Sequence, residues 1–461
     1  MRRIALCLGG LLLAPTLGCR PATMAGAAPE PVLTNPVRMD AWVGDAVVDE
    51  GTRGRGDLKY DGVFRLPLSG DWTFELPDEG RWALSRLELG TPAAYGDFVL
   101  AGSSRHAGLF VIDRLDGRLV RTLETTGPVQ APPVPLLLET ETEVQVPLAG
   151  TNHMVTRTQV TVEHQGWLIA DTFGSVWRLD PDLEPVWDAP YSAGSGIYRA
   201  PVVDGDQILL GTTKDQIQSI GLDDGAWRWS YKRDVARTSM ELAILGAPAP
   251  IVDGEEVIAG FSDGVLAGVD RTSGRVRWEV RVGDGQFPDI EAEAIVDDGV
   301  LVAAAFGGPV LGLDRTTRRV LWTVEDAGAV SSMELADGML YTSDSKGRVH
   351  SIEVSTGAVQ WTWELPNKIL GPPRRAGGSI LVGEVDGTLY ALDRFDGKRK
   401  WRFIPPDGTR LAGVATAPAV VGRQVLFPSA SGTLWSLIAE SGTVSNRSEE
   451  PAHRTDRVVG W

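Results

Sequence analysis

Cysteine is nearly absent from this chain: only Cys7 and Cys19 occur, both close to the N-terminus. At most one of them remains after the processing inferred below, so we expect no intrachain disulfide and no cysteine-based metal site. The five histidines stand alone, and no acidic run has the spacing of a calcium-binding loop. The sequence therefore predicts neither a metal nor a cofactor, and the fold must be stabilised by packing.

Positive charge is also scarce, with 44 Lys and Arg residues against 61 Asp and Glu residues and a formal net charge of −17 at pH 7. A phosphate backbone or an anionic lipid surface requires a basic face on its partner. We therefore expect no nucleic-acid partner. Bilayer-length apolar segments are lacking at the N-terminus as well, because the stretch Ile4–Leu13 is too short to span a membrane.

The N-terminus instead has the features of an export signal. Arg2 and Arg3 supply the charged start that precedes the apolar stretch of a secretory signal peptide. Residues 16–19, Thr-Leu-Gly-Cys, resemble a bacterial lipobox, in which Cys19 is lipidated and becomes the first mature residue. We therefore assign residues 1–18 to a lipoprotein signal peptide. Cleavage of an ordinary signal peptide nearby is the alternative.

The residues that follow Cys19 are small and rich in proline, without periodicity. Residues 19–57 are accordingly interpreted as the lipidated cysteine and a flexible tether. Arg20 stands where an Asp would resemble the inner-membrane retention signal of enteric bacteria. This favours a lipid anchor in the outer membrane, with the protein facing the periplasm.

The chain is rich in residues that mark turns and in tryptophan, with 54 Gly, 29 Pro and 15 Trp. One unit recurs: an apolar strand, a Gly-containing hairpin, an alternating strand that ends in Asp, then Gly and a Trp four residues later. Six intervals over the 258 residues from Asp180 to Ile438 average 43 residues, the length of a four-stranded propeller blade. The copies are Gly108–Arg121, Gly174–Trp187, Gln216–Trp229, Gly264–Trp278, Pro309–Trp322, Gly347–Trp361, Gly387–Trp401 and Gly432–Asn446.

These eight copies predict an all-β fold, an eight-bladed β-propeller that spans about residues 58–440 and is followed by a C-terminal tail, residues 441–461. The first interval between copies, from Asp113 to Asp180, is longer than the others and indicates an insertion at about residues 124–150. The repeat tryptophans are expected on the outer strand of each blade, as core between neighbouring blades. They are Trp72, Trp187, Trp229, Trp278, Trp322, Trp361 and Trp401.

The chain ends indicate how the ring closes. Residues 71–77 closely repeat residues 360–366, yet no blade precedes them, and the last copy lacks its Trp. The strand around Trp72 is therefore predicted to complete the last blade, which removes an exposed sheet edge.

The form Ala-Leu-Asp-x-x-x-Gly-Lys-x-x-Trp at residues 391–401 resembles the tryptophan-docking repeat of the quinoprotein (PQQ-repeat) family. A lipid-anchored chain of eight such repeats without a further domain is most similar to the BamB-type lipoproteins of outer-membrane protein assembly. This resemblance implies a non-catalytic periplasmic scaffold that binds protein partners in the β-barrel assembly (BAM) complex.

Two segments resemble the partner-binding residues of that family. Leu242 and Ile244 match an aliphatic loop, and Asp289 and Glu291 match an acidic pair that enters a strand of the next blade. The resemblance implies that they contact the POTRA region of a BamA-type subunit, and we expect the carboxylates to be exposed. Leu245 departs from the family, which carries an Arg there. A purely structural role stays open: the aliphatic pair as inner-strand core and the acidic pair as solvated strand starts.

An enzyme is the main alternative, a dehydrogenase that uses pyrroloquinoline quinone. Its site requires a disulfide between adjacent cysteines, a calcium cluster and a catalytic Asp in the central funnel. The adjacent cysteines and the calcium spacing are missing, so we expect no enzymatic activity. A sensor or scaffold propeller unrelated to barrel assembly stays open.

Overall fold

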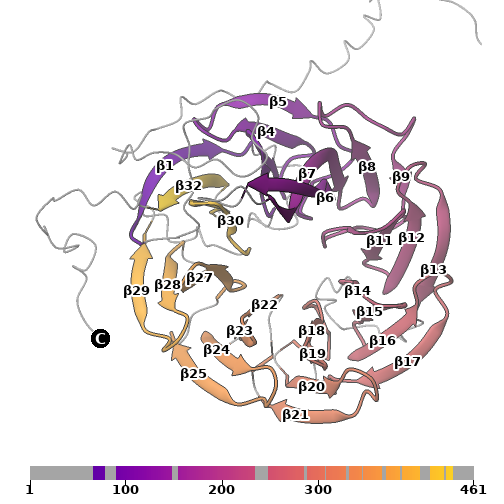
Figure 1. The fold of residues 1–461 in the computed structure, drawn as a ribbon, viewed down its shortest axis with the longest axis vertical. Coiled ribbons are helices and arrows are strands. Elements are labelled where there is room, and N and C mark those ends of the chain that lie inside the picture. The colour runs from indigo at the N-terminus through magenta and orange to yellow at the C-terminus, as the bar shows by residue number, and fades with distance from the viewer. Residues whose placement is uncertain are drawn as a thin grey trace, which may run out of the picture. The chain divides into compact units, whose positions relative to one another are not determined.

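The computed structural model describes thirteen stretches of the chain, all within one compact unit, residues 35–461. Their strands form eight four-stranded antiparallel sheets, with no helix among the described residues, and the sheets stand as the blades of a ring (Figure 1). The described stretches are residues 66–77, 90–147, 154–233, 248–284, 288–306, 308–325, 327–328, 332–344, 346–365, 370–384, 387–404, 416–429 and 432–439, with residues 139–161 described by their backbone.

The first four blades follow each other along the chain. Blade 1 comprises β2 (Ala93–Tyr95), β3 (Phe98–Gly102), β4 (Leu109–Asp113) and β5 (Leu119–Leu123). Blade 2 comprises β6 (Val134–Pro147), β7 (Met154–Ala170), β8 (Ser175–Leu179) and β9 (Tyr191–Ser192). Blade 3 comprises β10 (Val202–Asp204), β11 (Gln207–Thr212), β12 (Gln216–Gly221) and β13 (Trp227–Lys232). Blade 4 comprises β14 (Ile251–Asp253), β15 (Glu256–Gly260), β16 (Val265–Asp270) and β17 (Val276–Arg281).

The last four blades continue the same order until the ring closes. Blade 5 comprises β18 (Ile295–Asp297), β19 (Val300–Ala304), β20 (Val310–Asp314) and β21 (Val320–Val324). Blade 6 comprises β22 (Met333–Ala336), β23 (Met339–Ser343), β24 (Arg348–Glu353) and β25 (Val359–Glu364). Blade 7 comprises β26 (Arg374–Ala376), β27 (Ser379–Gly383), β28 (Leu389–Asp393) and β29 (Arg399–Phe403). Blade 8 comprises β30 (Ala419–Val421), β31 (Gln424–Pro428), β32 (Thr433–Ala439) and β1 (Leu68–Glu75).

Closure by the N-terminal strand is confirmed. Strand β1 pairs with β32 in antiparallel register from Leu68 opposite Ala439 to Glu75 opposite Thr433, and so completes blade 8 (Figure 1). The buried cluster beside it joins Trp72 and Phe74 of β1 to residues of β3, β4, β31 and β32. Strands from the two ends of the described chain therefore belong to one sheet, and the last blade has no unpaired outer strand at β32.

The burial of each strand follows from its place in the blade. The second and third strands are covered on both faces by neighbouring blades, and strand β11, for example, is buried along its whole length. The fourth strand lies at the rim and alternates, as in β25, where Trp361 is buried and its neighbours are exposed. The alternation of apolar and polar residues in the sequence thus belongs mainly to the outer strands.

The repeat tryptophan joins each blade to the next through a glycine. The Trp361 ring lies against Gly397 in the turn of blade 7, where a Cβ would come within 2.7 Å of the ring. Its indole N–H donates to the carbonyl of Arg394 at 3.0 Å. Gly397 has φ +70°, so both backbone conformation and ring contact require glycine. The same glycine contact recurs for Trp72, Trp187, Trp229 and Trp322.

Three tryptophans depart from the expected buried position in an outer strand. Trp187 precedes β9 rather than lying in it, although it is buried. Trp278 is partly buried because the next turn has Arg318, not glycine, at φ 61°, and its guanidinium lies 4.4 Å from the indole ring. The Trp278 N–H donates to Glu256 of its own blade instead. Trp401 is partly buried and stacks on Phe403, and residues 440–442, where its turn is expected, lie outside the described residues.

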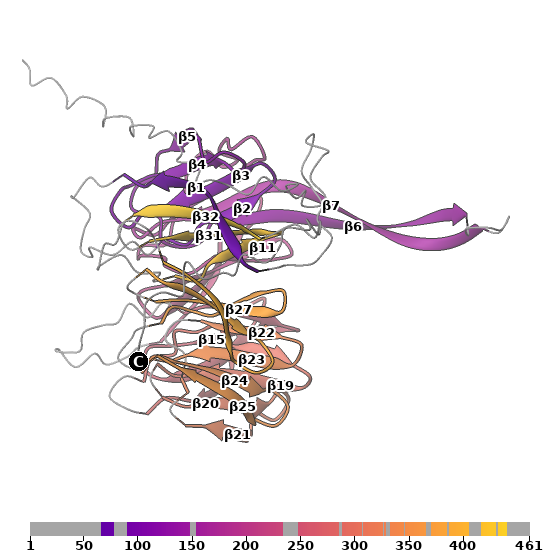
Figure 2. The same ribbon diagram turned by 90° about the vertical axis from the view of Figure 1, so that its left-hand side faces the viewer.

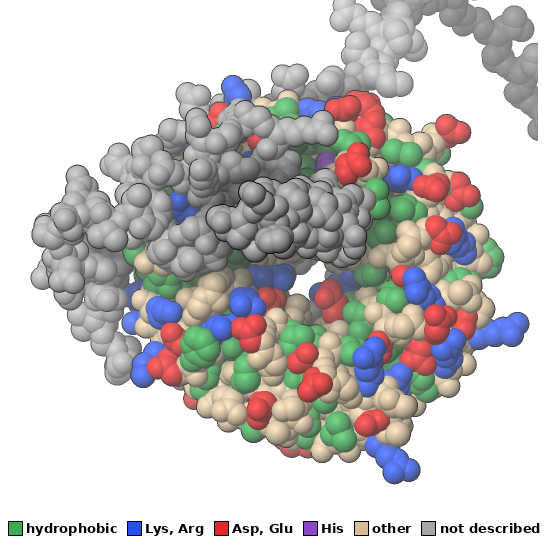
Figure 3. Space-filling view, viewed as in Figure 1, with side chains coloured by type: hydrophobic (Ala, Val, Ile, Leu, Met, Phe, Trp, Pro, Cys, Tyr) green, Lys and Arg blue, Asp and Glu red, His purple; other side chains and the backbone are tan. Residues whose placement is uncertain are grey.

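An ion pair also recurs between neighbouring blades. In several blades the residue after the turn Asp is an Arg that contacts an Asp in the first hairpin of the preceding blade. Arg315 Nε donates to Asp253 Oδ2 at 3.0 Å. The same contact joins Arg271 to Asp204 and Arg394 to Asp337. Acidic and basic side chains are accordingly interspersed over the visible face of the blades in Figure 3.

The antiparallel order gives the ring two different faces. One face carries the turns between the first and second strands and between the third and fourth strands of each blade. The β6–β7 hairpin leaves the ring on this side, which we call the arm face (Figure 2). The other side, the loop face, carries the remaining turns and the segments that connect one blade to the next.

Candidate functional site

The residues predicted to bind a partner belong to two segments that connect successive blades along the chain. Leu242 and Ile244 lie in residues 234–247, outside the described residues. Asp289 and Glu291 lie in the connection from β17 to β18 and are described. Blade 4 lies between these two connections, so the candidate site extends from the end of blade 3 to the start of blade 5.

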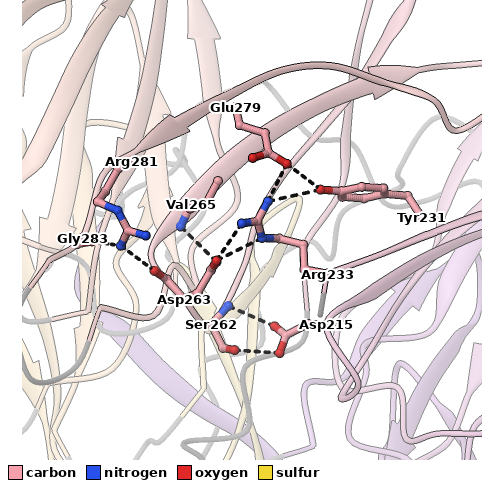
Figure 4. Close-up of polar contacts among 9 residues, drawn as sticks. All are labelled: Asp215, Tyr231, Arg233, Ser262, Asp263, Val265, Glu279, Arg281 and Gly283. Carbon is pink, nitrogen blue, oxygen red and sulfur yellow. Dashed lines mark hydrogen bonds and ion pairs between the residues drawn. The ribbon is translucent and has the colours of Figure 1, made fainter. Parts of the chain in front are cut away.

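Arg233, the last described residue before the first connection, is held by several hydrogen bonds. Its guanidinium donates to Asp263 from Nε at 3.1 Å and from Nη2 at 2.7 Å, and to Glu279 at 2.6 Å (Figure 4). The Tyr231 hydroxyl donates to the same Glu279 oxygen at 2.9 Å. Burial opposes the charge of Arg233, but the bonds to Asp263 and Tyr231 raise its pKa above the usual range. Arg233 thus stays charged and fixes the end of blade 3 to blade 4.

A second contact joins the same two blades beside it. Asp215, in the turn between β11 and β12, accepts from the Ser262 backbone N–H at 2.9 Å and from the Ser262 hydroxyl at 2.6 Å (Figure 4). Arg281 donates to the carbonyl oxygens of Asp263 and Gly283, and so orders the start of the second connection. Hydrogen bonds therefore fix the described residues at the start of both connections.

Glu291 is buried, with 7% of its surface exposed, so the expectation that both carboxylates are exposed is wrong. Asp289 is partly buried. The Glu291 Oε2 atom lies 3.6 Å from Arg199 Nη2, whereas Oε1 has no hydrogen-bond partner among the described residues. Burial raises the pKa of Glu291 to about 7, with Arg199 lowering it and Asp289 raising it.

Arg199 was not identified from the sequence, because no repeat position indicates it. It lies just before β10, the inner strand of blade 3, and Glu291 lies just before β18, the inner strand of blade 5. Their ion pair therefore links two connections of the loop face, the one from blade 2 to blade 3 and the one from blade 4 to blade 5. The described residues contain no group of three or more His, Cys, Asp or Glu that could hold a metal ion.

The buried carboxyl predicts a dependence of stability on pH. The folded pKa of Glu291, about 7, exceeds its ordinary value of 4.5, so the folded state binds the extra proton between these pH values. The contribution of Glu291 to the free energy of unfolding is therefore fully present below pH 4.5. It is lost as the pH rises through 7, by about 3 kcal/mol. We expect Glu291→Gln to remove this loss and to exceed the native protein in unfolding free energy at pH 8, measured by urea denaturation.

The control is Glu364→Gln, on the exposed side of strand β25. It is expected to show the same pH dependence as the native protein. A Glu291→Gln protein whose stability still falls between pH 5 and 8 as the native protein's does would contradict the assignment.

Comparison with known proteins identifies a family. A family model described as outer membrane protein assembly factor BamB matches residues 144–363 and 310–459, which together exceed half of the chain. BamB of Shewanella oneidensis, named an outer membrane protein assembly factor, is 28% identical over 126 residues, 25% of this chain and 32% of that protein. Serine/threonine-protein kinase AfsK of Streptomyces griseus is 37% identical over 73 residues, 14% of this chain and 9% of the kinase.

The chain thus spans less than a third of the length of these curated relatives. Among solved structures, BamB from Moraxella catarrhalis is similar with a TM-score of 0.61 at 20% identity, covering 81% of this chain and 100% of that chain. At this identity the likeness shows the propeller fold alone.

Proposed function

This chain belongs to the family described as outer membrane protein assembly factor BamB, and on that premise we propose that it is a non-catalytic scaffold that binds protein partners in the outer-membrane β-barrel assembly machinery. The observation that supports a binding role most directly is the set of hydrogen bonds that joins blades 3 and 4 on the loop face. Arg233 and Asp215 join blade 3 to blade 4 at the point in the chain where the segment with Leu242 and Ile244 begins. A rigid ring that presents loops can bind a partner without its own fold depending on that contact.

We assign the loop face to a POTRA region of a BamA-type subunit. Leu242 and Ile244 provide a small apolar centre, and Asp289 provides an acidic group at its border. Glu291 is buried, and its ion pair with Arg199 holds in place the connection that carries Asp289. Basic or hydrogen-bond-donating groups are the complementary chemistry on the partner.

The membrane association that we propose rests on the N-terminal segment. Residues 1–18 are a signal peptide, Cys19 is lipidated, and residues 19–57 connect the lipid to the propeller, which faces the periplasm from the outer membrane. No helix of the described residues is long and apolar enough to span a membrane. The propeller domain, residues 58–440, is then the partner-binding part of the chain.

The partner assignment predicts which substitutions weaken binding. We expect Asp289→Lys, and separately Leu242→Ala with Ile244→Ala, to weaken binding of a purified POTRA region by about 2 kcal/mol, roughly 30-fold, as lost interface contacts do. Titration calorimetry with the full chain measures this, and a thermal melt of each variant shows whether it folds.

The matched control is Glu255→Lys, which reverses a charge on an exposed residue in the first hairpin of blade 4, on the arm face. It should bind as the native protein does. Undiminished binding by folded Asp289→Lys and Leu242→Ala/Ile244→Ala proteins would place the interface elsewhere on the ring.

A further inference from the structure

The first hairpin of blade 2 is much longer than its counterparts. Strand β7 pairs with β8 only from Trp167 to Ala170, and its preceding residues pair with β6 alone. We call this two-stranded part, residues 137–164, the arm; its register runs from Leu137 opposite His164 to Pro147 opposite Met154. The other described first hairpins have strands of three to six residues. The arm leaves the ring on the arm face (Figure 2).

Both long edges of the arm lack a neighbour among the described strands. β6 is the first strand of its sheet and pairs with β7 alone, and β7 before Gly166 pairs with β6 alone. A strand edge of this kind presents a row of backbone N–H and C=O groups that can pair with another extended chain.

The two edges differ in charge. The sequence of β6 contains Glu139, Glu141 and Glu143, and charged residues in an edge strand are a common device against strand addition. In β7, residues 154–164 contain two charged residues of opposite sign, Arg157 and Glu163, and are otherwise rich in residues that favour strands. The latter are Val155, Thr156, Thr158, Val160, Thr161 and Val162. The edge of β7 is therefore the one open to a further strand.

We propose that the β7 edge of the arm, from Met154 to His164, accepts an extended segment of an outer-membrane β-barrel protein before it is inserted. This inference rests on the proposed function in barrel assembly. Eleven residues of strand span about 36 Å, and a transmembrane β-strand has about 9–11 residues. Pairing through backbone groups depends little on side chains, which suits a factor that meets many different barrels.

The place of the arm supports this division of roles. The arm extends from the arm face, whereas the connections assigned to the POTRA region lie on the loop face. A segment paired with β7 therefore leaves the proposed subunit interface accessible. The ring would hold the assembly subunit on one side and a barrel segment on the other.

The test uses the full chain and a labelled 11-residue peptide in which Val or Tyr alternates with Thr or Ser. Fluorescence anisotropy measures its affinity for the native protein and for a variant in which Asn-Gly replaces residues 138–163, a two-residue hairpin that suits the shortened strands. We expect at least a tenfold loss of affinity in the shortened variant. The same peptide with an N-methyl group at every residue should bind neither protein, because it has no backbone N–H left to donate.

Two charge variants separate the edges. Thr158→Lys with Val160→Lys places lysines on β7 opposite Glu143 and Glu141, which favours the arm itself while it charges the open edge. We expect this pair to reduce peptide affinity at least tenfold. Thr140→Lys with Thr142→Lys adds the same charge to β6 and should leave the affinity unchanged.

Equal affinity of the native and shortened proteins, or of the plain and N-methylated peptides, would overturn the proposal. Arm-dependent self-association in sedimentation without peptide binding would overturn it too, because the occupant would be a second copy of the chain. Affinity for the POTRA region, measured on the same shortened variant, should be unchanged. Loss of POTRA binding in every protein alongside arm-dependent peptide binding would contradict the proposed partner and leave the arm as a strand-binding site.

Discussion

A variant without residues 58–77 is expected to lose cooperative unfolding and to aggregate. These residues include strand β1, which pairs with β32 along blade 8. Without it, β32 becomes an unpaired edge, and the junction between blades 8 and 1 loses Trp72, Phe74 and Leu76, all buried. An open edge beside an exposed apolar wedge promotes association between chains. Urea unfolding followed by tryptophan fluorescence and by circular dichroism, with gel filtration, measures the effect.

The matched control is removal of the 20 residues at the other end, 442–461, which should leave the transition intact. The reason for the difference is that β1 contributes to the closure of the whole ring. Trp72 is 1% exposed, and its indole N–H donates to the carbonyl of Arg114 in blade 1 at 2.9 Å. A chain without residues 58–77 that unfolds in one transition at the native urea concentration would show that the other seven blades are sufficient.

Trp361→Ala is expected to reduce the free energy of unfolding by about 3–5 kcal/mol, the usual cost of removing a large core aromatic. The ring fills the junction between blades 6 and 7, where it contacts Gly397 and lies 5.8 Å from the Tyr341 ring, centroid to centroid. Removal leaves a cavity that the neighbouring blades cannot close without moving. Denaturant titration of both proteins measures the loss.

Trp227→Ala is the control for this prediction, because Trp227 lies on the outer strand of blade 3 but is 60% exposed. We expect its effect to stay below about 1 kcal/mol, as for surface substitutions in general. Similar losses for the two substitutions would mean that the buried tryptophans do not carry the junctions between blades.

Much of the fold was predictable because a blade is largely a local structure. The Asp-x-x-x-Gly turn, the alternating outer strand and the Trp that follows lie within about fifteen residues, so each copy is visible in the sequence. Closure was predictable for the same reason: the segment around Trp72 repeats the outer strand around Trp361 without the rest of a blade. The strand order of blade 8 confirms this.

The candidate site was less predictable. The acidic pair was located from a short local likeness, and Glu291 was expected to be exposed because strand starts usually are polar and solvated. It is buried instead, and its ion-pair partner Arg199 comes from the connection between blades 2 and 3. The length of the arm was also missed: the sequence indicates an insertion at about residues 124–150, whereas the paired ribbon runs from Leu137 to His164.

Local sequence was sufficient for the type of strand, the position of turns and the number of blades, because the signals of each copy lie within about fifteen residues. The closing strand was recognisable because its local pattern repeats that of an outer strand, although its partner β32 lies at the other end of the chain. Assembly of the ring was needed for the burial of Glu291, for the packing of Arg318 against the Trp278 ring and for the side from which the arm leaves. Desolvation and charge contacts depend on distance in space, and residues 92 positions apart, such as Arg199 and Glu291, come within 3.6 Å only when the blades are in place.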